Sequence, residues 1–219
     1  MSEENGKPSA ALRDRLLAGV DAYYSQKIAA HGCVPVGVDW NSSESQELRF
    51  EQLLRICSSQ ESFSINDYGC GYGALCGYLQ AHDLAADYRG CDISQEMIAH
   101  ARAQYPERPG IRFSLADSPP EPADYTVASG IFNVRLNATD DAWLSCILVS
   151  LDRMNVMSHR GFAFNCLTSY SDAERMRDYL YYADPRMLFD HCKRHYSRNV
   201  ALLHDYGLYE FTILVRKQL

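Results

Sequence analysis

Short apolar runs alternate along the chain with longer segments in which apolar residues recur every three or four positions. The short runs, which are typical of strands, lie at 63–68, 88–92, 111–117, 123–132, 161–167, 199–204 and 209–216. Helical spacing fills the intervals at about 44–58, 94–105 and 139–154. Regular alternation of strands and helices predicts an α/β fold with a doubly wound sheet, and the last two runs are spaced like a hairpin.

The chain before the first strand is predicted to be helical. Apolar side chains from Ala10 to about Ala30 repeat with the spacing of one helix face. A second helix is predicted to begin at a capping box, with Ser43 as N-cap and Gln46 reaching back to it. We therefore expect residues 1–60 to form a helical cover packed on a core of residues 61–219.

The first strand leads into three glycines at alternate positions, Asp67-Tyr-Gly69-Cys-Gly71-Tyr-Gly73, and a helical segment follows. Glycine permits positive φ and the approach of a ligand to bare backbone, and a helix N-terminus presents unpaired N–H groups. Gly69, Gly71 and Ala74 also satisfy the dinucleotide pattern G-x-G-x-x-G/A. Asp67 distinguishes the two classes of ligand, because a carboxylate there repels a pyrophosphate and attracts an ammonium or sulfonium group.

This glycine segment resembles the first motif, [D/E]-x-G-x-G-x-G, of the class I S-adenosylmethionine-dependent methyltransferases. Three further stretches follow in the order that the family shows, at 88–92, 111–117 and 123–132. In the family, the acid matching Asp92 holds the ribose hydroxyls, the acid matching Asp117 lies near the adenine amino group, and the fourth stretch lies beside the transferred methyl group. The resemblance implies a Rossmann-like core at 61–219 with a seven-stranded, mostly parallel sheet whose last strand is antiparallel, and S-adenosyl-L-methionine as cofactor.

The resemblance also implies which residues hold the cofactor. They belong to the glycine loop and to the ends of the following three strands: Asp67, Gly69, Cys70, Gly71, Tyr72, Gly73, Asp92, Ile93, Met97, Asp117, Ser118, Ser129 and Gly130. The methionine carboxylate of the cofactor requires a cation. Arg49, on the edge of the second predicted helix face, is either that cation or an ordinary solvated side chain, and we include it among the candidate cofactor ligands.

An insertion at 168–196, predicted to be helical and rich in Tyr and His, follows the fifth strand. Ligands of open α/β sheets bind beyond the carboxyl ends of the strands, so this insertion is expected to form the acceptor pocket with Phe132, Tyr170, Tyr181 and His195. The alternative is that these aromatic side chains only pack together. His195 is the candidate general base, which a hydroxyl acceptor requires and an amine, thiolate or carboxylate acceptor does not.

Composition narrows the choice of partners. The net charge is −7, from 21 basic and 28 acidic side chains, and no basic run occurs, which disfavours nucleic acid. Eight scattered cysteines without a C-x-x-C pair favour reduced thiols over disulfides or a metal site. No apolar run approaches the ~20 residues of a membrane span. With the polar N-terminus, these features predict a soluble cytoplasmic protein.

These observations predict an enzyme that moves a methyl group from S-adenosylmethionine to an O, N or S atom of a small-molecule acceptor. The fourth strand ends in Ser129-Gly130-Ile131-Phe132 and lacks the D-P-P-[YF] signature of methyltransferases that act on amino groups of nucleic-acid bases or Gln. Two alternatives are an NAD(P)-dependent oxidoreductase and a non-catalytic S-adenosylmethionine-binding protein on the same fold.

Overall fold

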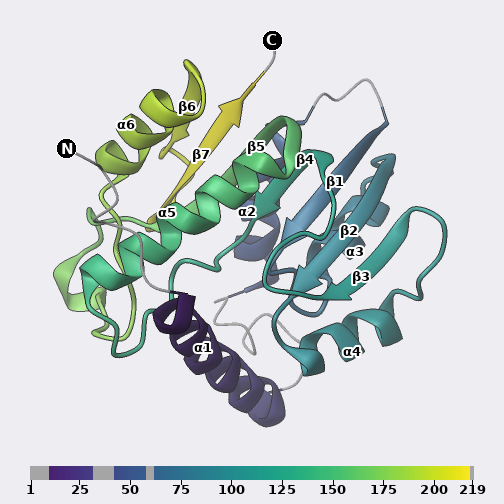
Figure 1. The fold of residues 1–219 in the computed structure, drawn as a ribbon, viewed down its shortest axis with the longest axis horizontal. Helices are drawn as coiled ribbons and strands as arrows, with labels where there is room; N and C mark the ends of the chain where they lie inside the picture. The colour runs from purple at the N-terminus through teal and green to yellow at the C-terminus, as the bar shows by residue number, and fades with distance from the viewer. Residues whose placement is uncertain (1–9, 32–41, 58–61, 218–219) are drawn as a thin grey trace.

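A seven-stranded sheet forms the centre of the computed structural model, which describes residues 10–31, 42–57 and 62–217 (Figure 1). The strand order is β3-β2-β1-β4-β5-β7-β6. The strands are β1 (Phe63–Tyr68), β2 (Ala86–Asp92), β3 (Ile111–Leu115), β4 (Ala123–Ala128), β5 (Ser158–Leu167), β6 (Asn199–Leu203) and β7 (Glu210–Arg216). The first five strands are parallel, and β7 lies antiparallel between β5 and β6. The predicted fold class, with its antiparallel last strand, is confirmed.

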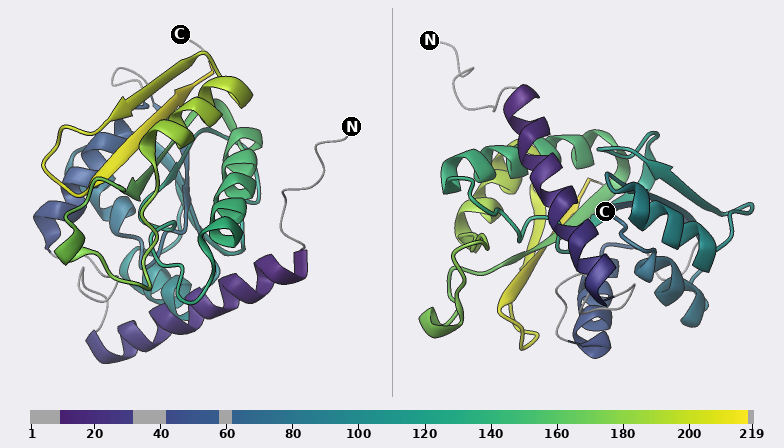
Figure 2. Two further views of the ribbon diagram at one scale, coloured as in Figure 1. Left: turned by 90° about the vertical axis from the view of Figure 1, so that its left-hand side faces the viewer. Right: turned by 90° about the horizontal axis from the view of Figure 1, so that it is seen from below.

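Helices cover both faces of the sheet. They are α1 (Ala10–His31), α2 (Ser43–Leu54), α3 (Ala74–Ala81), α4 (Gln95–Gln104), α5 (Asp140–Val156) and α6 (Pro185–His195). One face packs against α2, α3 and α4, and the other against α5 and α6 (Figures 1 and 2). Each interface forms its own apolar core, one around Leu53 and Ile65 and the other around Leu151 and Phe162. Figure 2 shows α1 running across one edge of the sheet rather than covering a face.

Helix α2 begins one residue earlier than the sequence predicted. Ser42, not Ser43, is the N-cap, and Ser42 and Ser45 form the reciprocal capping bonds. Gln46 does not take part in the cap as predicted. Its side chain is buried, and its Oε1 accepts a hydrogen bond of 3.2 Å from Tyr72 Oη. Two adjacent serines offer the same capping hydroxyl, so the choice between them depends on this tertiary contact.

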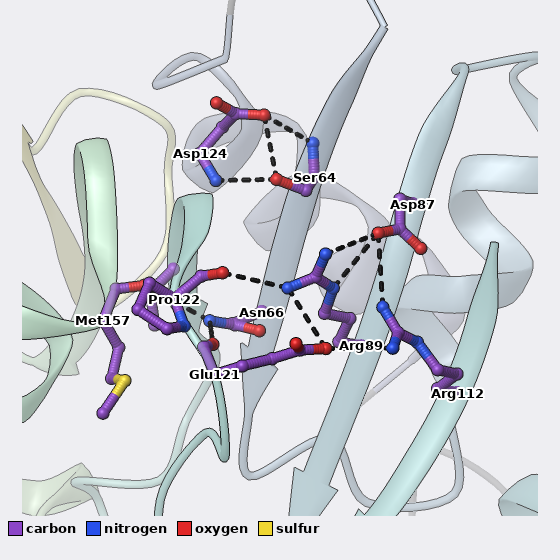
Figure 3. Close-up of polar contacts among 10 residues, drawn as sticks. Ser64, Asn66, Asp87, Arg89, Arg112, Glu121, Pro122, Asp124 and Met157 are labelled. Carbon is purple, nitrogen blue, oxygen red and sulfur yellow. Dashed lines mark hydrogen bonds and ion pairs between the residues drawn. The ribbon is translucent and has the colours of Figure 1, made fainter.

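No helix lies between β3 and β4, within a stretch that the structure describes completely. The sheet face beneath this connection carries charged side chains instead of an apolar surface (Figure 3). Arg89 on β2 donates to Asp87 at 2.7 Å and forms an ion pair with Glu121, and Arg112 on β3 contacts the same two carboxylates. Asn66 on β1 donates to the backbone carbonyl of Glu121. These contacts hold the connection across the strands.

The segment after β5 is irregular up to a short 3-10 turn, η2 (Ala173–Arg175), and continues to α6. Helix α6 begins close to the carboxyl end of β5, because Ala183 N donates to Leu167 O. It ends at the opposite edge of the sheet, where Ser197 Oγ donates to Arg216 O. Helix α6 is therefore the crossover that returns the chain to the start of β6. In the described part of the chain, no helix combines the length and apolarity that a bilayer span requires.

Candidate functional site

A cavity lies beyond the carboxyl ends of β1, β2 and β4, with α1 across it. Twelve of the predicted site residues line this cavity: Asp67, Gly69, Cys70, Gly71, Tyr72, Asp92, Ile93, Met97, Asp117, Ser129, Gly130 and Phe132. They come from four separate strand ends. The topology brings these ends together because parallel strands on either side of β1 leave the sheet at one edge.

The glycine loop takes a backbone conformation that other residues adopt only with strain. Gly69, Gly71 and Gly73 have φ values of +76°, +53° and +85°. A Cβ at Gly69 would lie 2.2 Å from Ile131 Cγ2, whereas a Cβ at Gly71 would meet only Met97 Sδ at 3.8 Å. The backbone at Gly71 is therefore open toward the cavity and available to a ligand. Gly73 faces the core instead, beneath Phe113, and serves as the N-cap of α3.

Asp92 connects the end of β2 to the glycine loop. Its Oδ2 accepts the Gly71 N–H at 2.9 Å, and its Oδ1 accepts the Ser94 N–H at 2.8 Å. Burial raises the pKa of Asp92 and outweighs these two hydrogen bonds, which lower it. Each carboxylate oxygen retains a second lone pair, so the side chain has capacity for further donors from the cavity.

Asp67 lies at the end of β1, in the wall of the same cavity. Only 2% of the residue is exposed, and its Oδ2 accepts a hydrogen bond of 2.7 Å from Tyr88 Oη. Burial raises the pKa of Asp67 from 3.8 to about 7, although the bond from Tyr88 lowers it. A cation in the cavity would favour the ionised form.

Asp117 connects α1 to the rim of the cavity. Its Oδ2 accepts from Arg13 on α1 at 2.6 Å and from Arg153 on α5 at 2.8 Å. Tyr68 Oη donates to the Asp117 carbonyl at 2.9 Å. Partial burial raises the pKa of Asp117, but the bonds from Arg153 and Arg13 lower it by more, so the carboxyl stays ionised. Because Arg13 is 5% exposed, this contact is an anchor for α1 rather than a loose surface ion pair.

The segment after β4 forms the remaining wall. Ser129 Oγ is buried and has no hydrogen-bond partner among the residues that the structure describes. Gly130 has a φ of +76°, and its N–H donates to Asn165 Oδ1 at 2.8 Å. Phe132 is buried beside Phe164. An unpaired buried hydroxyl in a cavity wall has the properties of a group that bonds to a ligand.

The residues present fit S-adenosylmethionine. The cavity offers bare backbone at Gly71, a carboxylate at Asp92 and an unpaired hydroxyl at Ser129. Four carboxyl groups line it, those of Asp21, Asp67, Asp92 and Asp117, and its described lining contains no Lys, Arg or His. This charge distribution favours a ligand with positive groups and disfavours a pyrophosphate.

The structure does not bring Arg49 to the cavity. Its guanidinium forms a buried bidentate ion pair with Glu210, with Nε–Oε2 and Nη2–Oε1 distances of 2.8 Å and 2.7 Å, and Nη1 donates to Ser45 O. The sequence interpretation that Arg49 pairs with the methionine carboxylate is therefore not supported. Glu210 lies 161 residues away in sequence, so local spacing does not reveal the pair.

The candidate base His195 is also remote from the cavity. It is exposed at the end of α6, stacked on His191 at 4.3 Å between ring centroids. Helix α6 lies toward the top of Figure 1 and α1 along the bottom. The sequence placed His195 in the insertion, but a helix of eleven residues carries it to the opposite edge of the sheet.

Besides Gly73, three other predicted residues lie outside the cavity lining. Tyr170 is 60% exposed, with its ring 5.9 Å from that of His204. Tyr181 is buried in the core beside α5 and α6. Ser118 is in the connection after β3 and contacts Asp117 only at 3.4 Å. The structure assigns the two tyrosines and the serine no direct place in the cavity wall.

The sequence analysis did not identify the residues by which α1 and α2 line the cavity. Leu17, Val20, Asp21 and Tyr24 of α1 and Gln46 and Phe50 of α2 line the cavity. The apolar stripe of α1 was visible in the sequence, but periodicity identifies a buried face without identifying what covers it. Asp21 is a charged residue within this apolar face, and this exception to the pattern could have indicated that the face lines a polar cavity.

Comparisons with known proteins identify methyltransferases. A family profile described as "Methyltransferase domain" matches residues 65–149. "Putative methyltransferase Rv1506c" from Mycobacterium tuberculosis is 58% identical over 164 residues, which are 75% of this chain and 99% of that protein.

Solved structures share the fold. The complex titled "DhpI-SAM-HEP complex" has 15% identity and a TM-score of 0.63, and the match covers 96% of this chain and 100% of that one. Magnesium protoporphyrin IX methyltransferase from Synechocystis PCC 6803 with bound S-adenosylmethionine has 12% identity, a TM-score of 0.56 and coverage of 94% and 96%. With the relative's near-complete coverage and the cavity described above, the chain belongs to the class I S-adenosylmethionine-dependent methyltransferases.

Proposed function

We propose that the protein transfers the methyl group of S-adenosylmethionine to an O, N or S atom of a small-molecule acceptor. The observation that carries the proposal is the position of α1. Leu17, Val20, Asp21 and Tyr24 of this helix line the cavity, so α1 closes part of the space beside the glycine loop. A small molecule fits beneath α1, whereas a macromolecule reaches the cavity only if α1 is displaced.

The residues of the cavity wall are proposed to hold the cofactor as follows. Asp92 accepts the ribose hydroxyls, bare backbone at Gly71 faces the nucleoside, and Asp67 stabilises the positive groups. Ser129 supplies a hydroxyl to the bound molecule. The placement of the three polar side chains around one cavity, together with the unpaired Ser129 oxygen, supports these roles.

The cofactor supplies an electrophilic methyl group with a neutral thioether as leaving group. The protein's own contribution is then orientation and exclusion of water, which the position of α1 across the cavity supports. The described lining contains acids, tyrosines and a cysteine but no histidine. We therefore favour an acceptor that arrives as a nucleophile, such as an amine, a thiolate or a carboxylate, because these need no histidine base.

The test is S-adenosylhomocysteine release with a panel of amines, thiols, carboxylic acids and phenols, run beside tRNA, DNA and a peptide mixture. We expect turnover with members of the small-molecule set. A protein that turns over only with a macromolecule contradicts the proposed acceptor class. Binding of NADH in place of S-adenosylmethionine in calorimetry contradicts the cofactor assignment.

A further inference from the structure

A buried polar chain runs from α2 to the cavity wall. Arg49 on α2 binds both oxygens of Glu210 at the start of β7. Asn165 Nδ2 on β5 donates to Glu210 Oε2 at 2.5 Å, and Asn165 Oδ1 accepts the Gly130 N–H at 2.8 Å. The exposed fractions of Arg49, Glu210 and Asn165 are 6%, 2% and 0%. All the contacts therefore lie in the interior, where each is shielded from competition by water.

The chemistry of the three side chains permits only one arrangement. A carboxylate accepts hydrogen bonds and cannot donate, so Glu210 requires the NH₂ group of Asn165 on its side. The carbonyl oxygen of Asn165 then has to face Gly130. Arg49 donates one hydrogen bond to each oxygen of Glu210. The amide orientation that suits the Gly130 N–H is thus set by groups on two other elements.

Gly130 is part of the cavity. It lies between Ser129 and Ile131, which also line it, and its backbone has a φ of +76°. Its carbonyl accepts the Asn133 N–H at 3.4 Å, so the Asn165 bond is the shorter of these two bonds to the Gly130 backbone. A change at Asn165 therefore changes the direction in which the Ser129 hydroxyl and the Gly130 backbone face.

A buried ion pair alone is a poor source of stability, since its desolvation cost offsets its attraction. Fixing the orientation of one amide is a role that an apolar replacement of the same shape cannot fill. We propose that Asn165 is a positioning residue for methyl transfer, held by the Arg49–Glu210 pair and acting on the cofactor through Gly130. This inference rests on the proposed placement of the cofactor beside Ser129 and Gly130.

The test compares S-adenosylhomocysteine affinity of the wild type with that of Asn165→Leu, Asn165→Asp and a control, Thr126→Val, by calorimetry. Thr126 is fully buried on β4, and its hydroxyl bonds Met157 O, away from the cavity. Asn165→Leu is expected to weaken binding about tenfold, equivalent to about one hydrogen bond, because the released Gly130 peptide has to be reoriented when the ligand binds. Thr126→Val is expected to lower the melting temperature and to leave the affinity within twofold of the wild type.

Asn165→Asp adds a readout that a merely structural role would not produce. Its carboxylate faces Glu210, so binding should be weak at pH 8.5 and approach the wild-type value at pH 6, where the two carboxyls share a proton. The neighbouring charged and titratable groups are Arg49, Tyr206 and Cys166, and burial raises the pKa of both Tyr206 and Cys166. Affinity is expressed relative to the wild type at each pH, which removes the titration of other cavity carboxyls.

Hydrogen exchange of the Gly130 amide in the unaltered protein gives a second test that needs no folded variant. Slow exchange is expected, because the N–H is bonded to a fully buried side chain. Exchange as fast as that of an exposed loop overturns the inference, as does Asn165→Leu with wild-type affinity. If the wild type itself does not bind S-adenosylhomocysteine, the proposed cofactor placement fails, and with it the role of Asn165 toward the cofactor.

Discussion

The buried carboxyl of Asp67 makes a quantitative prediction about pH. Its pKa is raised from 3.8 to about 7 by burial. The folded protein then binds a proton that the unfolded chain releases between these two values, so the free energy of unfolding falls as pH rises through this window. At 1.36 kcal/mol per pH unit, ionised Asp67 costs the free protein about 4 kcal/mol at pH 8. Asp67→Asn removes this cost, so the variant should gain stability over the wild type between pH 4 and pH 8.

Cofactor binding should show the opposite dependence. A cation in the cavity stabilises the ionised carboxylate, and the ionised fraction of a group with a pKa of about 7 rises from about one tenth at pH 6 to about nine tenths at pH 8. S-adenosylmethionine affinity should therefore rise about tenfold over this range. The ligand's own amine also titrates near this range, but it does so equally with Asp67→Asn. The ratio of wild-type to variant affinity isolates the contribution of Asp67.

The assays are urea denaturation of the free protein and calorimetric titration of the cofactor, both across pH 5 to 8.5. Tyr88→Phe serves as the matched variant. It retains the Asp67 carboxyl but removes the hydrogen bond that lowers its pKa, so the midpoint of the affinity curve should move to higher pH. The reasoning is refuted if Asp67→Asn shows the same pH dependence of affinity as the wild type, or gains no stability at pH 8.

Three further predictions concern the loop, α1 and the excluded base. Gly69→Ala should destabilise the free protein several kcal/mol more than Gly71→Ala in urea denaturation, because only the first adds a carbon 2.2 Å from a neighbouring side chain; positive φ alone costs about 1–2 kcal/mol. Arg13→Met should release α1 and speed dissociation of S-adenosylhomocysteine about tenfold in stopped-flow measurements. Arg153→Met leaves the Arg13–Asp117 contact of α1 in place and should change the rate less. Equal rates for the two variants contradict the anchoring role. His195→Ala should leave cofactor affinity and methyl transfer within about twofold of wild type, and a large loss would return this residue to the site.

Features set by neighbouring residues were predictable from the sequence. The first strand was expected at 63–68 and was found there, because an apolar run ending in glycines has few alternatives. Ser94 and Thr139 cap their helices through side-chain to backbone bonds that span only three residues. The alternation of strands and helices was sufficient to predict the parallel sheet. The parallel sheet in turn predicted that the acids at the carboxyl ends of its strands lie close together.

Features set by distant residues were not predictable in this way. Arg49 lies on a helix face that periodicity marked as marginal, and its partner Glu210 belongs to the last strand. The register of β7 against β5 places Glu210 beside Leu167. The residue spacing within either strand does not predict this register. Likewise, the aromatic residues in the segment after β5 suggested one pocket. Those on α6 lie instead along a helix that runs away from the cavity to the opposite end of the sheet.

The acids of the cavity are tolerated in three different ways, and the differences bear on how the site works. Asp117 is neutralised by two arginines, Asp92 is held by two backbone N–H groups, and the pKa of Asp67 is raised to about 7 because burial outweighs its single hydrogen bond. Asp67 therefore titrates near neutral pH, where a charged ligand changes its ionisation. Methyl transfer removes the sulfonium charge of the cofactor and leaves its ammonium charge, so with the proposed placement the interaction that favours ionised Asp67 weakens once the product forms. The same carboxyl that favours the substrate form of the cofactor thereby favours release of the product form, which links the charge of one buried side chain to turnover.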